Sequence, residues 1–222
     1  MGALKKILWQ WPDGFVWKLT HGLTVGSRRK KFRTFLKIMK PGASTTILDV
    51  GAAGSNERAK NFLEDWYQFP EKITAVGVDD LSAFKKHHPT VTVVQADGRK
   101  LPFKDKQFDV VFSNAVIEHV GNRHDQQQFV NECLRVGKSV FLTTPSRSFP
   151  IESHTMIPFV HYLPTDVRNI IYQLLGRKHE GTPNNLTLLT GRSFKKLFPK
   201  NVHVRIVRQR MLGFTSVLIA VV

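Results

Sequence analysis

Along the middle of the chain, the hydrophobic positions switch between the spacing of strands and the spacing of helices. Short aliphatic runs end in polar or glycine-rich turns, and longer stretches between them repeat apolar residues at helical intervals. Strands that alternate with helices require crossover connections, which predicts a parallel, doubly wound sheet. The expected strands are 45–51, 73–80, 90–97, 108–115 and 139–145, and the expected helices between them are 56–66 and 125–136.

The two ends of the chain show other patterns. Residues 202–212 and 215–222 are strand-like and are joined by a tight link at Gly213, which predicts an antiparallel hairpin at the sheet edge. Residues 27–39 predict a helix with one apolar stripe and a dense basic face. The stripe consists of Phe32, Phe35, Leu36 and Met39. We therefore expect an α/β fold: a Rossmann-like, mostly parallel sheet with a C-terminal antiparallel hairpin and an N-terminal helical cap.

Composition fits one such domain with a small appendage. The chain has 222 residues, of which 41% are hydrophobic. We expect a basic amphipathic cap over residues 1–40 and the main domain over 41–222, with a substrate-lid insertion at about 146–190. Cys133 is the only cysteine, which excludes an intrachain disulfide and a cysteine-based metal site and favours a reducing compartment. The sequence has no long apolar run and no signal-peptide pattern, so we expect a cytoplasmic protein.

Charge is concentrated at the two flanks. The net charge is +16, and residues 1–40 and 168–210 each hold ten basic residues against one acid. The segment between them, 41–167, holds thirteen basic and fifteen acidic residues. If the flanks meet in space, they form one cationic face suited to nucleic acid, anionic lipid or a phosphorylated carrier. The alternative is a merely solvated basic surface.

Ligand-binding residue types follow four of the expected strands. Ligands of a parallel sheet bind beyond the carboxyl ends of its strands, where glycine allows close approach to the backbone and an acid can accept from ribose hydroxyls. The turn is not that of a dinucleotide or Walker loop, because glycines and a Lys-Ser/Thr pair are missing. In strand order, the candidates are Asp49, Gly51, Ala53 and Gly54; Asp79 and Asp80; Asp97 and Gly98; Ser113 and Asn114.

Five segments in this order resemble the class I S-adenosylmethionine-dependent methyltransferases, in particular the small-molecule, type 11 group. They are LDVGAAGS (48–55), VGVDD (76–80), QADGRKLPF (95–103), FDVVFSNAVIEHV (108–120) and LRVGKSVFLTTP (134–145). The resemblance is strong over residues 45–145 and loose over the C-terminal hairpin.

The resemblance implies S-adenosyl-L-methionine as the cofactor and assigns a part of it to each strand end. The turn from Gly51 through Ala53 to Gly54 would cradle the methionine part, and Asp49 would orient its amino group. The remaining roles are Asp79, or less favourably Asp80, for the ribose, Asp97 backed by Gly98 for the adenine amine, and Asn114 near the methionine amine or the sulfonium.

A sulfonium methyl group is already electrophilic, so the enzyme must position the acceptor, and a hydroxyl acceptor benefits from a general base. Glu118 and His119 follow the fourth strand, and His119 is the leading candidate because imidazole titrates near neutrality. The alternative is an interior polar pair that fixes the loop. The segment also resembles ubiquinone-pathway O-methyltransferases, in which an acid three residues earlier helps to bind a divalent metal. Ala115 stands there, so we expect no metal.

Residues 145–164 hold four prolines, which stiffen a loop rather than build a helix. We interpret this segment as a substrate lid with polar groups on an apolar wall, or else as a loop whose polar groups are structural. Its candidates are Arg147, Glu152, His161 and Tyr162 for substrate binding and His154 for catalysis.

The first seventeen residues hold three of the four tryptophans together with lysines. This mixture suits a membrane interface or a cap that closes over the cofactor. We therefore expect an O-methyltransferase for a small-molecule, lipid-linked or glycan acceptor, peripheral on the inner face of the membrane. The alternatives are an RNA methyltransferase that uses the cationic face and a non-catalytic binding protein with the same fold.

Overall fold

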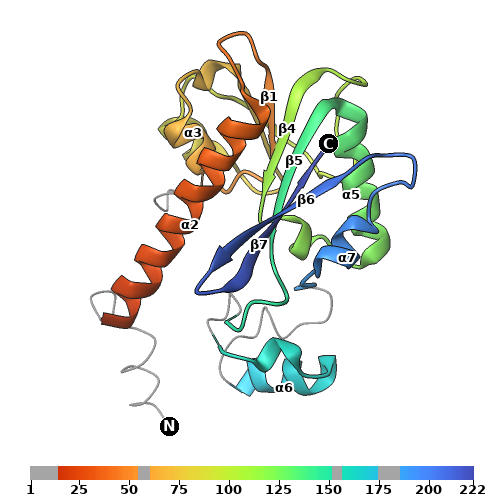
Figure 1. Ribbon diagram of the computed structural model, residues 1–222. Helices are drawn as coiled ribbons and strands as arrows, with labels where there is room; N and C mark the ends of the chain where they lie inside the picture. Colours follow the sequence, from red (N-terminus) through yellow and green to blue (C-terminus); the bar gives the residue numbers. More distant parts are fainter. Residues whose placement is uncertain (1–14, 55–60, 152–156, 175–185) are drawn as a thin grey trace.

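The computed structural model describes residues 15–54, 61–151, 157–174 and 186–222, with side chains described from residue 24 onward. This part of the chain forms one seven-stranded sheet in the order β3-β2-β1-β4-β5-β7-β6 (Figure 1). Strands β1 to β5 are parallel, and β7 is antiparallel to both β5 and β6. The predicted Rossmann-like sheet with a C-terminal antiparallel hairpin is confirmed.

The strands are β1 (Ile47–Val50), β2 (Ile73–Gly77), β3 (Thr92–Gln95), β4 (Phe108–Asn114), β5 (Gly137–Pro145), β6 (Arg205–Met211) and β7 (Phe214–Val221). The α-helices are α2 (Phe15–Met39), α3 (Phe62–Trp66), α4 (Ser82–His87), α5 (Arg123–Val136), α6 (Thr165–Leu174) and α7 (Gly191–Lys195). Three short 3₁₀ turns are η1 (Pro70–Lys72), η2 (Ile117–His119) and η3 (Val160–Tyr162).

The helices cover the sheet in two layers, with α2 and α3 on one face and α5 and α7 on the other (Figure 1). Side chains of a strand point alternately to the two faces. Along β4, Val110 and Phe112 join the core under α2 and α3, whereas Val111 joins the core under α5. This alternation decides which residues at the strand ends can reach a common pocket.

Helix α2 is anchored to the sheet by one aromatic side chain. Phe35 is fully buried and lies edge-on against Phe112 and Phe141, with ring centroids 5.1 and 5.3 Å away. The predicted helix over 27–39 is therefore real but begins earlier, at Phe15. The predicted apolar stripe is wrong at Leu36, which is exposed, while the basic residue Lys31 is buried.

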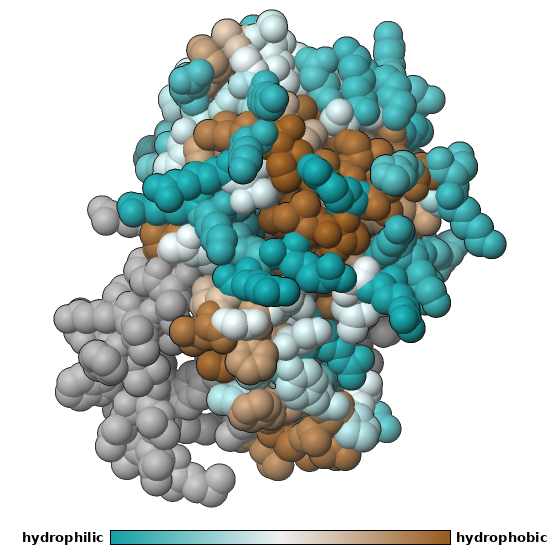
Figure 2. All heavy atoms as spheres, in the orientation of Figure 1, coloured by the Kyte–Doolittle hydropathy of each residue, from teal (hydrophilic) through white to brown (hydrophobic). Residues whose placement is uncertain are grey.

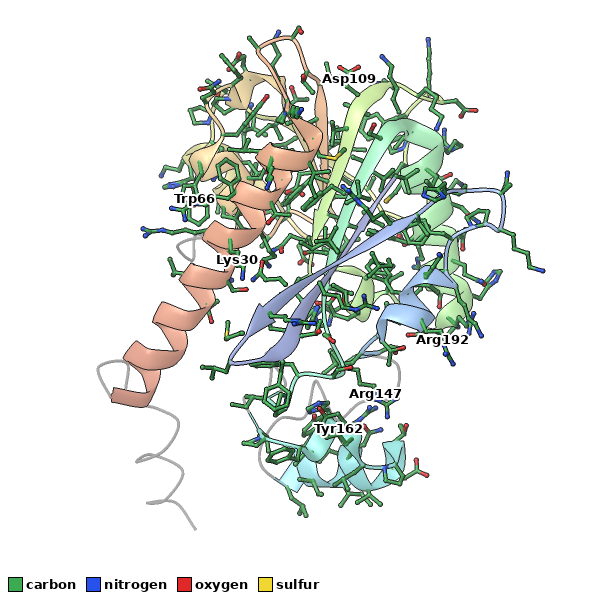
Figure 3. The ribbon with its side chains drawn as sticks, viewed as in Figure 1. Lys30, Trp66, Asp109, Arg147, Tyr162 and Arg192 are labelled. Atoms are coloured by element: carbon green, nitrogen blue, oxygen red, sulfur yellow. The ribbon has the colours of Figure 1, made fainter. Side chains whose placement is uncertain are left out.

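The two basic flanks of the chain meet in space. Gln209 on β6 donates from Nε2 to the hydroxyl of Ser27 on α2 at 2.9 Å, and Lys30 donates from Nζ to the carbonyl of Arg210 at 3.3 Å. The N-terminal helix and the C-terminal hairpin thus share one basic surface, and Lys30 points outward from α2 (Figure 3).

The segment after β5 leaves the sheet at its carboxyl edge and continues into η3 and α6. Helix α6 begins directly after Pro164, a position where proline's missing N–H and fixed φ suit the approach to a helix. The four prolines of residues 145–164 predict a loop, and the helix that follows them is not among the elements that the sequence predicts. None of the described helices is both long and apolar enough to cross a membrane.

Candidate cofactor site

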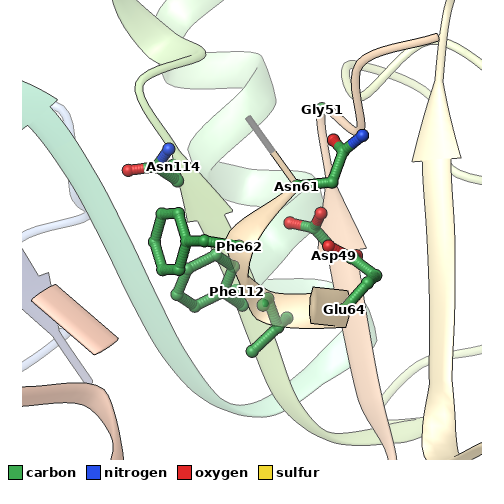
Figure 4. Close-up of a pocket in the computed structure, with 8 residues that line it drawn as sticks. Asp49, Gly51, Asn61, Phe62, Glu64, Phe112 and Asn114 are labelled. Carbon is green, nitrogen blue, oxygen red and sulfur yellow. The ribbon is translucent and has the colours of Figure 1, made fainter. Parts of the chain in front are cut away.

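A pocket opens at the carboxyl ends of β1 and β4, where the strand order reverses (Figure 4). This is the place where open α/β sheets bind ligands. Strand β1 and its turn contribute Asp49 and Gly51, and β4 contributes Phe112 and Asn114. The remaining lining comes from the start of α3: Asn61, Phe62, Leu63 and Glu64.

The glycine turn after β1 is held in shape from two sides. Gly51 has a φ of 105°, and a Cβ at this position would lie 2.1 Å from a methyl group of Val116. A Cβ on Gly54 would lie 2.3 Å from the carbonyl oxygen of Asp80. Both positions therefore require glycine, because a side chain would collide with its neighbours.

Asn61 closes the turn with a pair of hydrogen bonds. The amide of Ala53 donates to Asn61 Oδ1 at 3.0 Å, and Asn61 Nδ2 donates to the carbonyl of Ala53 at 3.0 Å. Residues 55–60, with the expected helix cap at Ser55, lie outside the described residues. The bidentate contact fixes the position of the turn relative to α3, and thereby shapes the pocket wall.

Two buried carboxyl groups face each other in this wall. Burial and the neighbouring Glu64 carboxyl raise the pKa of Asp49 well above its usual value, and burial raises the pKa of Glu64 to about 7. Both side-chain oxygens of Glu64 are buried, with no donor among the described residues apart from a proton shared with Asp49. A buried carboxyl pair in this state favours a cationic ligand, which would replace the shared proton.

A lysine borders the pocket at the end of β4. Lys31 Nζ donates a short hydrogen bond to Asn114 Oδ1, which also accepts from the hydroxyl of Thr143 at 2.9 Å. The ammonium group lies 5.5 Å from the centroid of the Phe62 ring. Burial, followed by the positive charge of Arg28, lowers the pKa of Lys31 to about 8. Lys31 is thus within reach of neutrality at ordinary pH.

The acids after β2 differ in availability. Asp80 Oδ1 accepts from the amide and the hydroxyl of Ser82, at 2.9 and 2.6 Å, and these bonds lower the pKa of Asp80. One carboxylate oxygen of Asp80 is therefore already hydrogen-bonded to the first residue of α4. Asp79 is exposed beside the glycine turn, so it remains the better candidate for accepting from hydroxyl groups of a ligand.

The acid after β3 is held by an arginine. Both carboxylate oxygens of Asp97 accept from Arg99, with the shortest contact, from Nη2, at 2.6 Å. Arg99 also reaches Asp125 at 3.0 Å. Gly98 packs tightly behind it, since a Cβ there would lie 2.6 Å from the ring of Phe129. The role of Asp97 toward an exocyclic amine stays a prediction, and the carboxylate would have to share its oxygens with Arg99.

The two candidate catalytic residues after β4 lie in different surroundings, one buried and one exposed. Glu118 is fully buried and accepts from the hydroxyl of Thr144 at 3.0 Å, while its backbone carbonyl accepts from the amide of Thr187. This is the arrangement of a group that fixes a loop. His119 is exposed on η2 and is not among the described residues that line the pocket. The catalytic roles of both residues stay predictions.

The lid candidates lie farther along the segment after β5. Arg147 is exposed, and its carbonyl lies 3.2 Å from Nε2 of the buried His161. The rings of His161 and Tyr162 are 4.1 Å apart, and Figure 3 shows Arg147 and Tyr162 on the side of the segment near α6. Glu152 and His154 lie outside the described residues.

The sequence does not single out Asn61 and Glu64, which line the pocket, or Lys31, which contacts the lining residue Asn114. Lys31 belongs to a basic run that looks solvated, and the other two fall inside an expected helix. The sequence carries no local signal for them, because their roles arise when α2 and α3 pack against the ends of β1 and β4.

The sheet order and the site at its switch point define a Rossmann-like fold of the class I methyltransferase kind. Residues 48–140, somewhat less than half of the chain, match the family described as "Methyltransferase domain". No curated protein matches the sequence significantly.

Solved structures share the fold at low sequence identity. The PH0226 protein of Pyrococcus horikoshii OT3 is 17% identical over 89% of each chain, with a TM-score of 0.57. The methyltransferase domain of bacterial CtHen1 is 18% identical over 87% of this chain and 98% of the other, with a TM-score of 0.55. The CurJ carbon methyltransferase is 12% identical over 82% of this chain and 49% of the other, with a TM-score of 0.53. The family match and the shared fold support a S-adenosylmethionine-dependent methyltransferase and imply S-adenosyl-L-methionine as its cofactor.

The pocket residues fit this cofactor. The buried carboxyl groups of Asp49 and Glu64 suit the α-ammonium group of its methionine part. A bound cation would offset the cost of burying these carboxyl groups. The narrow turn at Gly51 and Gly54 admits a ligand close to the backbone. The role of the exposed Asp79 toward the ribose hydroxyls stays a prediction.

Proposed function

We propose that this protein transfers the methyl group of S-adenosylmethionine to a hydroxyl oxygen of a small-molecule, lipid-linked or glycan acceptor. The observation that carries the proposal is the Lys31 amine, buried beside Asn114 with a pKa of about 8. A hydroxyl loses its proton when it is methylated, so the reaction needs a nearby group that accepts a proton. Enzymes tune lysine to this range by burial for that purpose.

The cofactor, when bound, supplies a methyl group on a positively charged sulfur, and the protein supplies position and proton transfer. Asp49 and Glu64 would hold the amino end of the cofactor and Asp79 its ribose. A second positive charge in the pocket lowers the pKa of Lys31 further, because like charges disfavour the protonated form. Lys31 is then the base that accepts the hydroxyl proton at Nζ, while Asn114 keeps the amine oriented through its Oδ1.

We infer that α2 acts as the cap of residues 1–40 and that residues 146–190 form the acceptor lid. The position of Lys31 supports the first inference, since α2 brings it to the pocket from the N-terminal flank. His119 remains the alternative base, and Arg147, His161 and Tyr162 remain the candidate acceptor contacts.

Methylation of RNA is the second candidate function. The meeting of the two basic flanks at Ser27, Lys30 and Arg210 favours it, because a continuous cationic surface binds phosphates. The burial of the Lys31 amine favours the hydroxyl acceptor, since phosphate binding needs exposed cations.

The test is transfer of a radiolabelled methyl group to a fractionated cell extract, counted separately in lipid, glycan, small-molecule, RNA and protein. We expect label in a lipid, glycan or small-molecule fraction, with the methyl group released by ether but not ester cleavage. The Asp79→Ala variant should abolish labelling by losing the cofactor. Label in RNA alone would establish the second candidate instead, and release of the label by ester hydrolysis would exclude a hydroxyl acceptor.

A further inference from the structure

Large apolar side chains are exposed at one end of the molecule, beyond the carboxyl ends of the parallel strands. They lie on the tip of the β6–β7 hairpin, on the approach to η3 and on α6. The hairpin and the start of the lid segment lie at the same edge of the sheet, because Pro145 at the end of β5 pairs with Val217 of β7. The exposed residues are Phe159, Val167, Ile170, Leu174, Leu212 and Phe214. We call this set the apolar end.

Two of these residues have a backbone conformation that disfavours them. Leu212 and Gly213 form the two-residue hairpin turn with φ angles of 50° and 83°, a geometry that selects asparagine, aspartate or glycine. Leu212 nevertheless occupies it with 82% of its surface exposed. Phe159 has a φ of 64° and is 63% exposed. Neither turn chemistry nor burial within the chain explains a large apolar residue at either position.

Helix α6 also exposes apolar side chains and buries polar ones. Val167, Ile170 and Leu174 follow one another at i, i+3 and i+7 and form an exposed stripe, whereas Asn169 and Tyr172 face inward and are buried. An ordinary surface helix turns its apolar stripe to the core. Figure 2 shows the apolar surface of α6 at the lower end of the molecule.

Basic residues flank the hairpin part of the apolar end and occur on the lid segment. Arg210 precedes the hairpin tip by two positions and is exposed, and Lys30 on α2 donates to its carbonyl. Arg29 on α2 and Arg147 after β5 are also exposed. The described part of α6 carries a single acid, Asp166. We call these flanking cations the basic rim.

We propose that the apolar end docks on an anionic lipid bilayer, with α6 and the hairpin tip in the interfacial region and the basic rim on the headgroups. Single apolar side chains on turns, a short helix with an outward apolar stripe and flanking cations are the features that bind a bilayer interface. A protein partner would call for a continuous complementary surface, and RNA would gain nothing from exposed aliphatic groups.

The docking surface lies at the same edge of the sheet as the cofactor pocket. Docking would therefore turn the pocket toward the membrane and favour a lipid-linked acceptor among those proposed above. This last point rests on the proposed function. The docking itself needs neither cofactor nor methyl transfer, so the two can be tested apart.

The test is co-sedimentation of the full chain with vesicles of phosphatidylcholine, with and without phosphatidylglycerol. We expect binding to the anionic vesicles that weakens with salt. The triple variant Ile170→Gln, Leu174→Gln, Leu212→Asn should bind at least about tenfold more weakly, since apolar contact with the interface is lost without a change of net charge. The control exchanges Ile170→Leu and Leu174→Ile, which conserve apolar area and should bind as the wild type does.

Folding is monitored by thermal unfolding, and Leu212→Asn should leave the midpoint unchanged or raise it because asparagine suits the turn. The transfer-defective Lys31→Met variant should bind vesicles normally. If the triple variant binds as well as the wild type, the binding belongs to the N-terminal segment or to charge alone, and the proposal is wrong. Absence of binding by the wild-type chain would also overturn it.

Discussion

Replacing Lys31 by methionine tests the proposed proton transfer most directly. Methionine keeps much of the length of the side chain and removes the amine, and Asn114 retains its hydrogen bond from Thr143. A general base contributes about 10²- to 10⁴-fold to a rate, so we expect the turnover of Lys31→Met to fall by that factor. Binding of S-adenosylhomocysteine should change little.

The pH dependence gives a second readout with a calculable size. A base with a pKa of about 8 has a neutral fraction that rises about 25-fold between pH 6.5 and pH 8.5. The rate of the wild-type enzyme should rise by about this factor over that window, or reach its plateau earlier if the bound cofactor lowers the pKa further. The residual rate of Lys31→Met should lack this rise.

The Lys31→Met substitution should raise the stability of the protein while it lowers the activity. The unfolded chain keeps the Lys31 proton up to about pH 10.5 and the folded chain only up to about pH 8, so the shift corresponds to about 3 kcal/mol of destabilisation below pH 8. Between these values the unfolded state binds more protons, and wild-type stability rises with pH. Lys31→Met should therefore be more stable than the wild type at pH 7, and by a smaller margin at pH 9.5, in urea unfolding.

The matched control is Lys37→Met, the same change at an exposed position of α2. It should leave the rate, the pH profile and the stability near those of the wild type. A Lys31→Met enzyme with wild-type turnover, or with an unchanged pH profile, would remove Lys31 from the reaction and return His119 to consideration.

Three further predictions concern the pocket and its support. Glu64→Gln should weaken binding of S-adenosylhomocysteine in calorimetry. Because the pKa of Glu64 is raised to about 7, wild-type stability falls as pH rises from about 4.5 to 7, and urea unfolding of the variant should show a smaller fall, since only the raised pKa of Asp49 remains. Gly54→Ala places a Cβ 2.3 Å from the carbonyl of Asp80, so the turn must shift and calorimetry should show at least about tenfold weaker binding of the same ligand. Phe35→Ala should lower the free energy of unfolding by about 3–5 kcal/mol, whereas Leu36→Ala, at an exposed site, should change it by less than about 1 kcal/mol.

The sheet was predictable because its signal is local. Strands β1 and β2 are short aliphatic runs that end at or just before a glycine, and the hairpin is marked by Gly213 between two strand-like runs. The ends of the parallel strands could also be placed at one edge of the sheet, but the adjacency of β1 and β4 was not predicted.

The burial of Lys31 could not be predicted in this way. Its place in a run of five basic residues within 28–33 indicates a solvated face, and only the packing of Phe35 onto Phe112 turns that position toward the sheet. Helix α6 was missed for a related reason. The four prolines of residues 145–164 predict a loop, but Pro164 stands just before the helix, where proline is favourable.

Helix α2 connects the two proposals of function and docking. One face of it is fixed to the core through Phe35 and presents Lys31 to Asn114, and another is bonded to the hairpin through Ser27 and Lys30. The C-terminal hairpin is therefore hydrogen-bonded to the helix that carries the proposed base. Because the Lys31 amine is desolvated by this packing, any displacement of α2 that admits water would raise its pKa toward the ordinary value and remove the base. The burial of the Lys31 amine therefore has two effects. It lowers the stability of the folded chain at neutral pH, and it makes the amine able to accept a proton.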